Sequence, residues 1–196
     1  MASLLDYPAM LFRELFVPRK TKVFTVPDIG WTITVPKKFH LLSPKQIERL
    51  AKKGEGDFDG LIEKRRSSPC RQILFMARYE ISNKMVVSVT NFDVLSEIDW
   101  KRQNDEAYNN ALKIAHFTSQ DFKHVDITTE RGARQKGSVV FNTLDIVASI
   151  PSRELYRNRH YSTVYKNYGI HIIMSFVDEK IGEDMLDVLR NSTFTN

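Results

Sequence analysis

Cysteine is nearly absent from this sequence of 196 residues, since Cys70 is its only one. A single thiol excludes an intramolecular disulfide and a thiolate metal cluster, and it leaves the redox compartment open. Long apolar runs are also lacking, because the most apolar stretches, 139–150 and 170–177, are each interrupted by polar residues. A membrane-spanning helix needs about 20 consecutive apolar residues, so the sequence predicts a soluble protein without a bilayer-spanning segment.

The start of the sequence does not have the pattern of a secretion signal. Residues 1–16 lack a basic region and carry Asp6 and Pro8 early, whereas a signal peptide opens with positive charge before its apolar segment. We therefore expect a cytoplasmic protein, or an extracytoplasmic protein of the periplasm or cell envelope if a leader was removed before Ser3.

The composition is that of an ordinary globular domain, with 42% hydrophobic and 27% charged residues. Twelve Phe and seven Tyr supply large side chains for one core. The formal charge of +5 is small beside 29 basic and 24 acidic residues, so a mildly basic, solvated surface explains it better than a dedicated polyanion site. We expect a single domain over residues 1–196, with residues 1–20 forming an N-terminal helix and lead-in.

Helical periodicity appears in a few places along the chain. Apolar residues between 4 and 16 recur at helical spacing, and Ser43–Gln46 forms a capping box that predicts a helix ending near Gly54. A short helix over 61–66, a clearer one from about Asp105 to Phe117, and a final one over 179–189, opened by Asp178, complete the helices.

Strand patterns fill most of the remaining sequence. Short β-branched or aromatic runs predict an N-terminal hairpin, then a second hairpin, then a long meander joined by short connections. The predicted strands are 23–26, 31–35, 72–80, 84–91, 125–129, 137–150, 156–166 and 168–177, and residues 131–136 are expected to form a connection. The fold class predicted is α+β, with a mostly antiparallel sheet of about six strands flanked by helices. Nine residues are expected to share one continuous core: Trp31, Ile33, Val35, Phe75, Val87, Leu112, Phe141, Ile172 and Leu189.

Three stretches of the chain resemble the PsbP/DcrB-like group, α+β domains found as photosystem extrinsic subunits and bacterial envelope lipoproteins. Trp31–Pro36 is similar to the short strand that opens such domains, and Gly137–Phe141 to their mid-chain entry into a long strand. Tyr168–Phe176, followed by the helix 179–189 and Asn191–Phe194, is similar to their closing strand, helix and tail. The resemblance implies a PsbP-like sandwich and a protein partner, with no shared catalytic residues; a lipobox cysteine is missing.

Motifs for metal, nucleotide or thiol chemistry do not emerge. The glycines of Gly54–Gly60 have the wrong spacing for a dinucleotide loop and follow a helix, and an acidic loop is the better interpretation. The five histidines lack metal-ligand spacing, although His160 and His171 could meet across adjacent strands on a solvent face. We interpret Cys70 as structural and expect neither a cofactor nor a metal, with a hydrolase or thiol enzyme as the third hypothesis.

The best binding signal is the basic and aromatic strand 153–166. It combines cations with aromatic rings, and neither of its two faces is apolar, so we expect an exposed edge strand with Arg157 and Arg159 beside Tyr161 on the solvent side. The candidate binding residues are Arg153, Arg157, Arg159, Tyr161, Tyr165 and Lys166. The leading hypothesis is a non-enzymatic binding or accessory protein with a protein partner. The alternative is a module that binds anions or single-stranded nucleic acid through this strand.

Overall fold

The computed structural model describes residues 21–52, 71–79, 83–93, 96–119 and 124–195. Their strands are β1 (Lys22–Val26), β2 (Trp31–Val35), β3 (His40–Leu41), β4 (Arg71–Tyr79), β5 (Asn83–Asn91), β6 (Asp126–Lys136), β7 (Val139–Ile150), β8 (Arg153–Tyr165), β9 (Tyr168–Phe176) and β10 (Thr193–Phe194). Their helices are η2 (Pro27–Ile29), α2 (Pro44–Lys52), α4 (Glu97–Ser119) and α5 (Glu179–Arg190).

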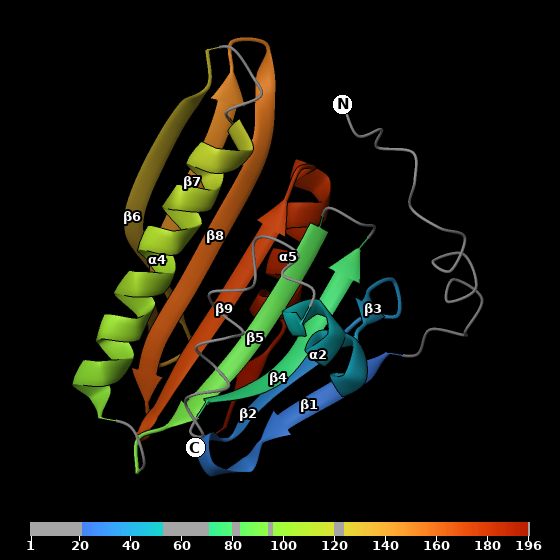
Figure 1. Cartoon of the computed structure of the whole chain (residues 1–196). Helices are drawn as coiled ribbons and strands as arrows, with labels where there is room; N and C mark the ends of the chain where they lie inside the picture. Colours follow the sequence, from blue (N-terminus) through green and yellow to red (C-terminus); the bar gives the residue numbers. More distant parts are fainter. Residues whose placement is uncertain (1–20, 53–70, 80–82, 94–95, 120–123, 196) are drawn as a thin grey trace.

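The described strands form a large antiparallel sheet and a small one. The seven-stranded sheet has the order β3-β4-β5-β9-β8-β7-β6, and the three-stranded sheet has the order β1-β2-β10. Helices α4 and α2 lie on one face of the large sheet, whereas α5 lies on the opposite face (Figure 1). The predicted α+β class with a mostly antiparallel sheet is confirmed, although the described strands outnumber the six expected.

Two-residue turns join the long strands of the meander. Gly137, with φ at 59°, turns β6 into β7, where Lys136 pairs with Val139. Lys166 and Asn167, with φ at 45° and 62°, turn β8 into β9. Positive φ at both central residues is the geometry of the tight hairpin turn that matches strand twist. The segment 131–136, expected to be a connection, is instead the second half of β6, because the actual turn is only two residues long.

Capping residues explain where the helices begin. The amide of Gln46 donates to Ser43 Oγ at 3.3 Å and the amide of Ser43 donates to Gln46 Oε1 at 2.7 Å, so the predicted capping box forms. Asp178 accepts from the amide of Ile181 at the start of α5, also as predicted. The predicted helix 105–117 begins earlier, at Glu97, where Ser96 Oγ accepts from the amide of Asp99.

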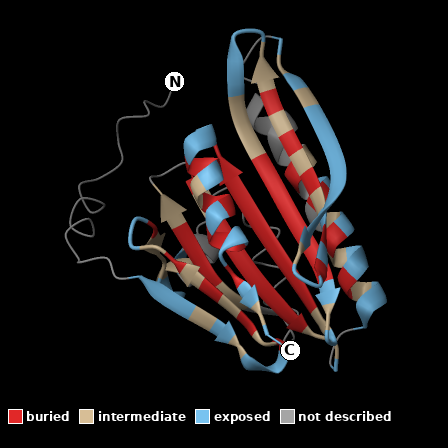
Figure 2. Cartoon of the chain, turned by 180° about the vertical axis from the view of Figure 1, so that it is seen from behind, coloured by how far each residue is buried: buried red, intermediate tan, exposed pale blue. Residues whose placement is uncertain are grey.

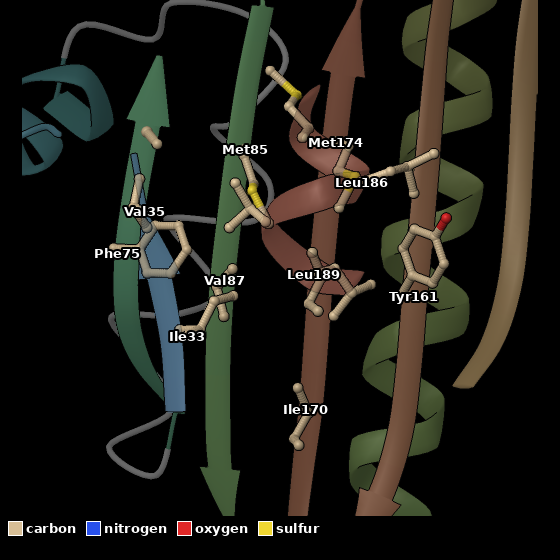
Figure 3. Packing of buried hydrophobic residues seen from close by; sticks show 14 of the residues in the cluster. Ile33, Val35, Phe75, Met85, Val87, Tyr161, Ile170, Met174, Leu186 and Leu189 are labelled. Carbon is tan, nitrogen blue, oxygen red and sulfur yellow. The ribbon is translucent and has the colours of Figure 1, made fainter. Parts of the chain in front are cut away.

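The main core lies between the large sheet and the layer made by α5 and the small sheet. Side chains from β2, β4, β5, β8, β9 and α5 interdigitate there, as Figure 3 shows for ten labelled residues. Eight of the nine predicted core residues belong to this cluster; Leu112 instead packs on the opposite face, under α4 with Leu144 and Ile146. The predicted N-terminal helix, the loop 54–60, the helix 61–66 and Cys70 lie outside the described residues.

Candidate functional site

Strand β8, which contains the predicted binding residues, is an interior strand and not the expected edge. It pairs with β7 on one side and with β9 on the other. Arg159 and Tyr161 are only 5% and 1% exposed, so they do not lie on the solvent side. The prediction was wrong because each polar face of β8 is covered. Helix α4 covers one face. On the other face, Asp145 of the neighbouring strand β7 neutralises the charge of Arg159.

The arginines at the start of β8 lie apart from its centre. Arg153 is exposed beside the turn, opposite Ile150. Arg157 is half-buried, and its guanidinium donates to both carboxylate oxygens of Glu154, at 3.0 and 2.8 Å. Its terminal nitrogen also lies 3.8 Å from Glu179 at the start of α5. Arg157 is thus held by acidic neighbours at one end of α5.

Tyr165 and Lys166 lie at the far end of β8. The Tyr165 ring meets the Phe194 ring edge to face at 5.3 Å, and Lys166 Nζ lies 5.4 Å from the centre of the Tyr165 ring. These contacts join the β8–β9 turn to the C-terminal strand β10. The structure therefore separates the six predicted residues into a starting pair, a central pair and a terminal pair.

The central pair, Arg159 and Tyr161, belongs to a polar site on the α5 side of the sheet. Arg159 Nε donates to both carboxylate oxygens of its cross-strand partner Asp145, at 2.7 and 2.9 Å. The Arg159 guanidinium also lies 5.8 Å from the centre of the Phe176 ring. Besides this ion pair, the Arg159 side chain lies close enough to the Tyr161 hydroxyl to lower the pKa of that group, against the larger effect of burial, which raises it.

A pocket of about 160 Å³ opens beside Arg159 and Tyr161. Strand β6 contributes one wall, and β7 and β8 contribute the other. The lining residues are Glu130, Gly132, Ala133, Arg134, Thr143, Asp145, Arg159 and Tyr161. The Tyr161 hydroxyl is buried without a hydrogen-bond partner among the described residues, and in Figure 3 it is turned away from Leu189. A buried polar atom that lines a pocket without a partner indicates a place for a ligand or an ordered water.

Tyr161 and Arg159 are both protonated at neutral pH. Burial raises the pKa of Tyr161 above that of an ordinary tyrosine, while the charges of Arg159 and Arg134 act in the opposite direction. The hydroxyl is therefore protonated at neutral pH and can donate. Burial lowers the pKa of Arg159, but the hydrogen bond and charge of Asp145 outweigh burial, so the net pKa is raised and the guanidinium stays charged.

Comparison with known proteins gives a likeness in fold. A solved structure, the solution structure of cyanobacterial PsbP from Synechocystis sp. PCC 6803, matches 92% of this chain and 95% of its own length, with 12% identity and a TM-score of 0.47. No protein-family model and no curated protein matches the chain.

Sequence reasoning missed six of the eight residues that line the pocket. Arg134, Gly132 and Glu130 were assigned to a connection or left out, and Asp145 was counted only as an interruption of an apolar run. Antiparallel register could have found them, because the two-residue turn at Gly137 pairs Glu130 with Asp145 and Gly132 with Thr143. The sequence signal for a strand over 130–136 was weak, because β6 is exposed there and apolar and polar residues do not alternate beyond residue 129.

The predicted meeting of His160 and His171 is confirmed, but the pair is buried and not on a solvent face. His160 Nδ1 lies 3.2 Å from His171 Nε2, and the Tyr108 ring lies edge-on to both rings. Within the part of the chain that the structure describes, no three metal-ligating side chains gather. None of the described helices is long and apolar enough to cross a membrane.

Proposed function

We propose that this chain is a non-enzymatic binding protein that holds an anionic group of its ligand in the pocket of β6, β7 and β8. The observation that carries the proposal is Tyr161, which lines the pocket with Arg134 and Arg159 and whose buried, protonated hydroxyl lies near Arg159 but makes no hydrogen bond of good geometry to the described residues. A neutral hydroxyl and an arginine both donate hydrogen bonds, and donors to a charged acceptor make the stronger bonds.

The pocket favours a ligand with one anionic group over a polyanion. Asp145 already neutralises Arg159, and Glu130 places a second carboxylate in the lining, so the pocket has no large excess of positive charge. The volume of about 160 Å³ accommodates a carboxylate or a single phosphate with water. Glu130 could accept a hydrogen bond from a hydroxyl or ammonium group elsewhere on the same ligand.

Binding of single-stranded nucleic acid has less support. Such proteins stack bases on exposed aromatic rings along a basic groove. Tyr161 is 1% exposed and its ring is packed in the core, so the ring offers no stacking surface to a base. The Tyr165 ring packs against Phe194, and the Arg157 guanidinium is hydrogen-bonded to Glu154.

Titration with acetate and with inorganic phosphate, followed by amide chemical shifts, tests the proposal. We expect saturable shifts in residues 130–134, 143–145 and 159–161. Tyr161→Phe removes one donor and keeps the ring, and Arg134→Gln removes one charge, so each should weaken binding by about tenfold, a loss of about 1.4 kcal/mol.

Arg131→Gln is the matched control, because Arg131 is adjacent to the pocket-lining Gly132 and so points to the opposite face of β6. It should leave the affinity unchanged. The proposal fails if neither anion gives saturable shifts at the pocket. It also fails if Tyr161→Phe and Arg134→Gln bind as tightly as the Arg131→Gln control.

A further inference from the structure

The outer edge of β6 is open over a long stretch. Within the described residues β6 pairs with β7 along its 11 residues and with no other strand, which makes it the last strand of the sheet. Residues 128–135 are all exposed, as the pale blue strand in Figure 2 shows. An edge strand offers unpaired N–H and C=O groups to an added strand.

A single glycine connects this open edge to the pocket. Gly132 pairs with Thr143, and Thr143 pairs with Tyr161, so the three form one row across β6, β7 and β8. Side chains in such a row share one face of the sheet. Because Gly132 has no side chain, β6 itself does not cover the row, and the Thr143 hydroxyl, 3.2 Å from where a Cβ on Gly132 would lie, borders the path by which a side chain from beyond the edge can enter the pocket. Glycine inside a strand is typical of a place where another group approaches closely.

We propose that the ligand is an extended acidic segment of a partner protein, which adds as a strand to β6 and places a glutamate over Gly132 into the pocket. This inference rests on the proposed function, since it names the source of the anionic group. Strand addition supplies affinity through main-chain hydrogen bonds, and pockets for alternate side chains supply specificity.

The dimensions of a sheet are consistent with this placement. A residue on an added strand opposite Gly132 lies three strand spacings from Tyr161, roughly 14 Å between Cα atoms. Strand side chains stand roughly perpendicular to the sheet, so a glutamate on the added strand reaches the near side of the pocket, and a water can bridge it to Tyr161. Arg134, two residues from Gly132 and on the same face, flanks the path.

The charge of the edge favours an acidic segment. Between Arg131 and Lys136 the strand carries three cations, with Arg134 between them, and no carboxylate. Charges on an edge strand also discourage aggregation between like edges, which accounts for the exposed Arg131 in isolated molecules. Such protection does not require a pocket behind the edge or a glycine in the middle of the strand.

The test measures the affinity of three ligands. Two are short polythreonine peptides with blocked ends, one with a glutamate and one with a glutamine at the centre, and the third is free acetate. We expect the glutamate peptide to bind at least about tenfold more tightly than the glutamine peptide and than acetate. Amide exchange in β6 should slow in the bound state. Gly132→Val, which suits a strand but covers the path, should abolish the preference for glutamate.

Thr129→Val is the control, because residue 129 lies on the other face of β6 and the same β-branched side chain there should change nothing. If acetate binds and depends on Tyr161, but the glutamate peptide gains no affinity and no β6 amide is protected, the inference fails and the proposed function stands. If neither acetate nor peptide binds, both fail. A concentration-dependent dimer through β6 in place of peptide binding would also overturn the inference.

Discussion

The imidazole rings of His160 and His171 lie nearly parallel beneath α4, with their centres 5.4 Å apart and an interplanar angle of 27°. Burial lowers the pKa of His160 to about 3, so the folded protein holds this histidine neutral. The unfolded chain takes up a proton near pH 6.5, and the stability that the neutral form provides is therefore lost as the pH falls below that value.

We expect the free energy of unfolding to decrease by roughly 2 to 3 kcal/mol between pH 6.5 and pH 4.5 on account of His160. Urea denaturation at several pH values measures it. His160→Phe should flatten the dependence by that amount, whereas His124→Asn, a change at an exposed histidine with φ at 62°, should leave it as steep as in the parent. An equal slope in parent and His160→Phe would contradict the assignment.

The ion pair of Asp145 and Arg159 predicts a strongly asymmetric response to mutation. Asp145→Asn leaves the buried Arg159 charge without its partner, and we expect a loss of about 3 kcal/mol in the free energy of unfolding. Asp145→Leu combined with Arg159→Met removes both charges and should recover part of that loss. Glu183→Gln, which breaks an exposed pair with Arg190, should cost less than about 1 kcal/mol. Chemical denaturation of the parent and the three variants measures these free energies. Equal losses of stability for Asp145→Asn and Glu183→Gln would refute the predicted asymmetry.

Gly182 allows α5 to approach β9 closely. A methyl group at this position would overlap the ring of Phe176, whereas alanine is otherwise the better helix former. We expect Gly182→Ala to lower the free energy of unfolding by roughly 1 to 3 kcal/mol, with Phe176→Leu in the same chain relieving the overlap. Lys180→Ala, at an exposed position of the same helix, should stay within about 0.5 kcal/mol. Thermal unfolding measures the stability of each variant. If Gly182→Ala were more stable than the parent, α5 would be able to move away from Phe176 without cost, which would contradict the prediction.

Lys166 occupies the left-handed region of backbone conformation, with φ at 45°. Asparagine tolerates this region better than lysine, and β-branched residues tolerate it least. We expect Lys166→Asn to raise the free energy of unfolding by about 0.5 kcal/mol and Lys166→Val to lower it by about 1 kcal/mol or more. Both variants lose the contact between Lys166 and the Tyr165 ring. If both shift the melting temperature equally, the lost ring contact and not the backbone is responsible.

The sequence predicted most of the architecture because local signals agreed with the tertiary structure. Capping residues marked α2 and α5, and alternation in 168–177 correctly assigned Ile170, Ile172 and Met174 to the core. The short β8–β9 turn led to the correct antiparallel pairing. These features depend on contacts between residues near in sequence or on which face of one strand or helix is apolar. Sequence periodicity indicates both.

The candidate site could be predicted only in part, since it depends on pairing between strands. Arg159 and Tyr161 were named from their residue types, but Asp145 and Arg134 join them through register across β6 and β7. The interior position of β8 was missed for a related reason. Polar residues such as His160 and Ser162 were taken to need water, whereas His160 Nδ1 bonds to His171 and Ser162 bonds to Tyr108 beneath α4.

The small sheet joins segments that are far apart in sequence. Strand β2 pairs with β1 directly before it, but its other neighbour is β10, where Phe194 lies parallel to Trp31 with ring centres 5.6 Å apart. During synthesis the ribosome releases β2 long before it releases residues 193–194. A nascent chain therefore exposes one edge of β2 and one side of Trp31 until translation has passed residue 194. For that interval this tryptophan lacks its ring partner, and completion of the small sheet depends on a contact between segments far apart in sequence.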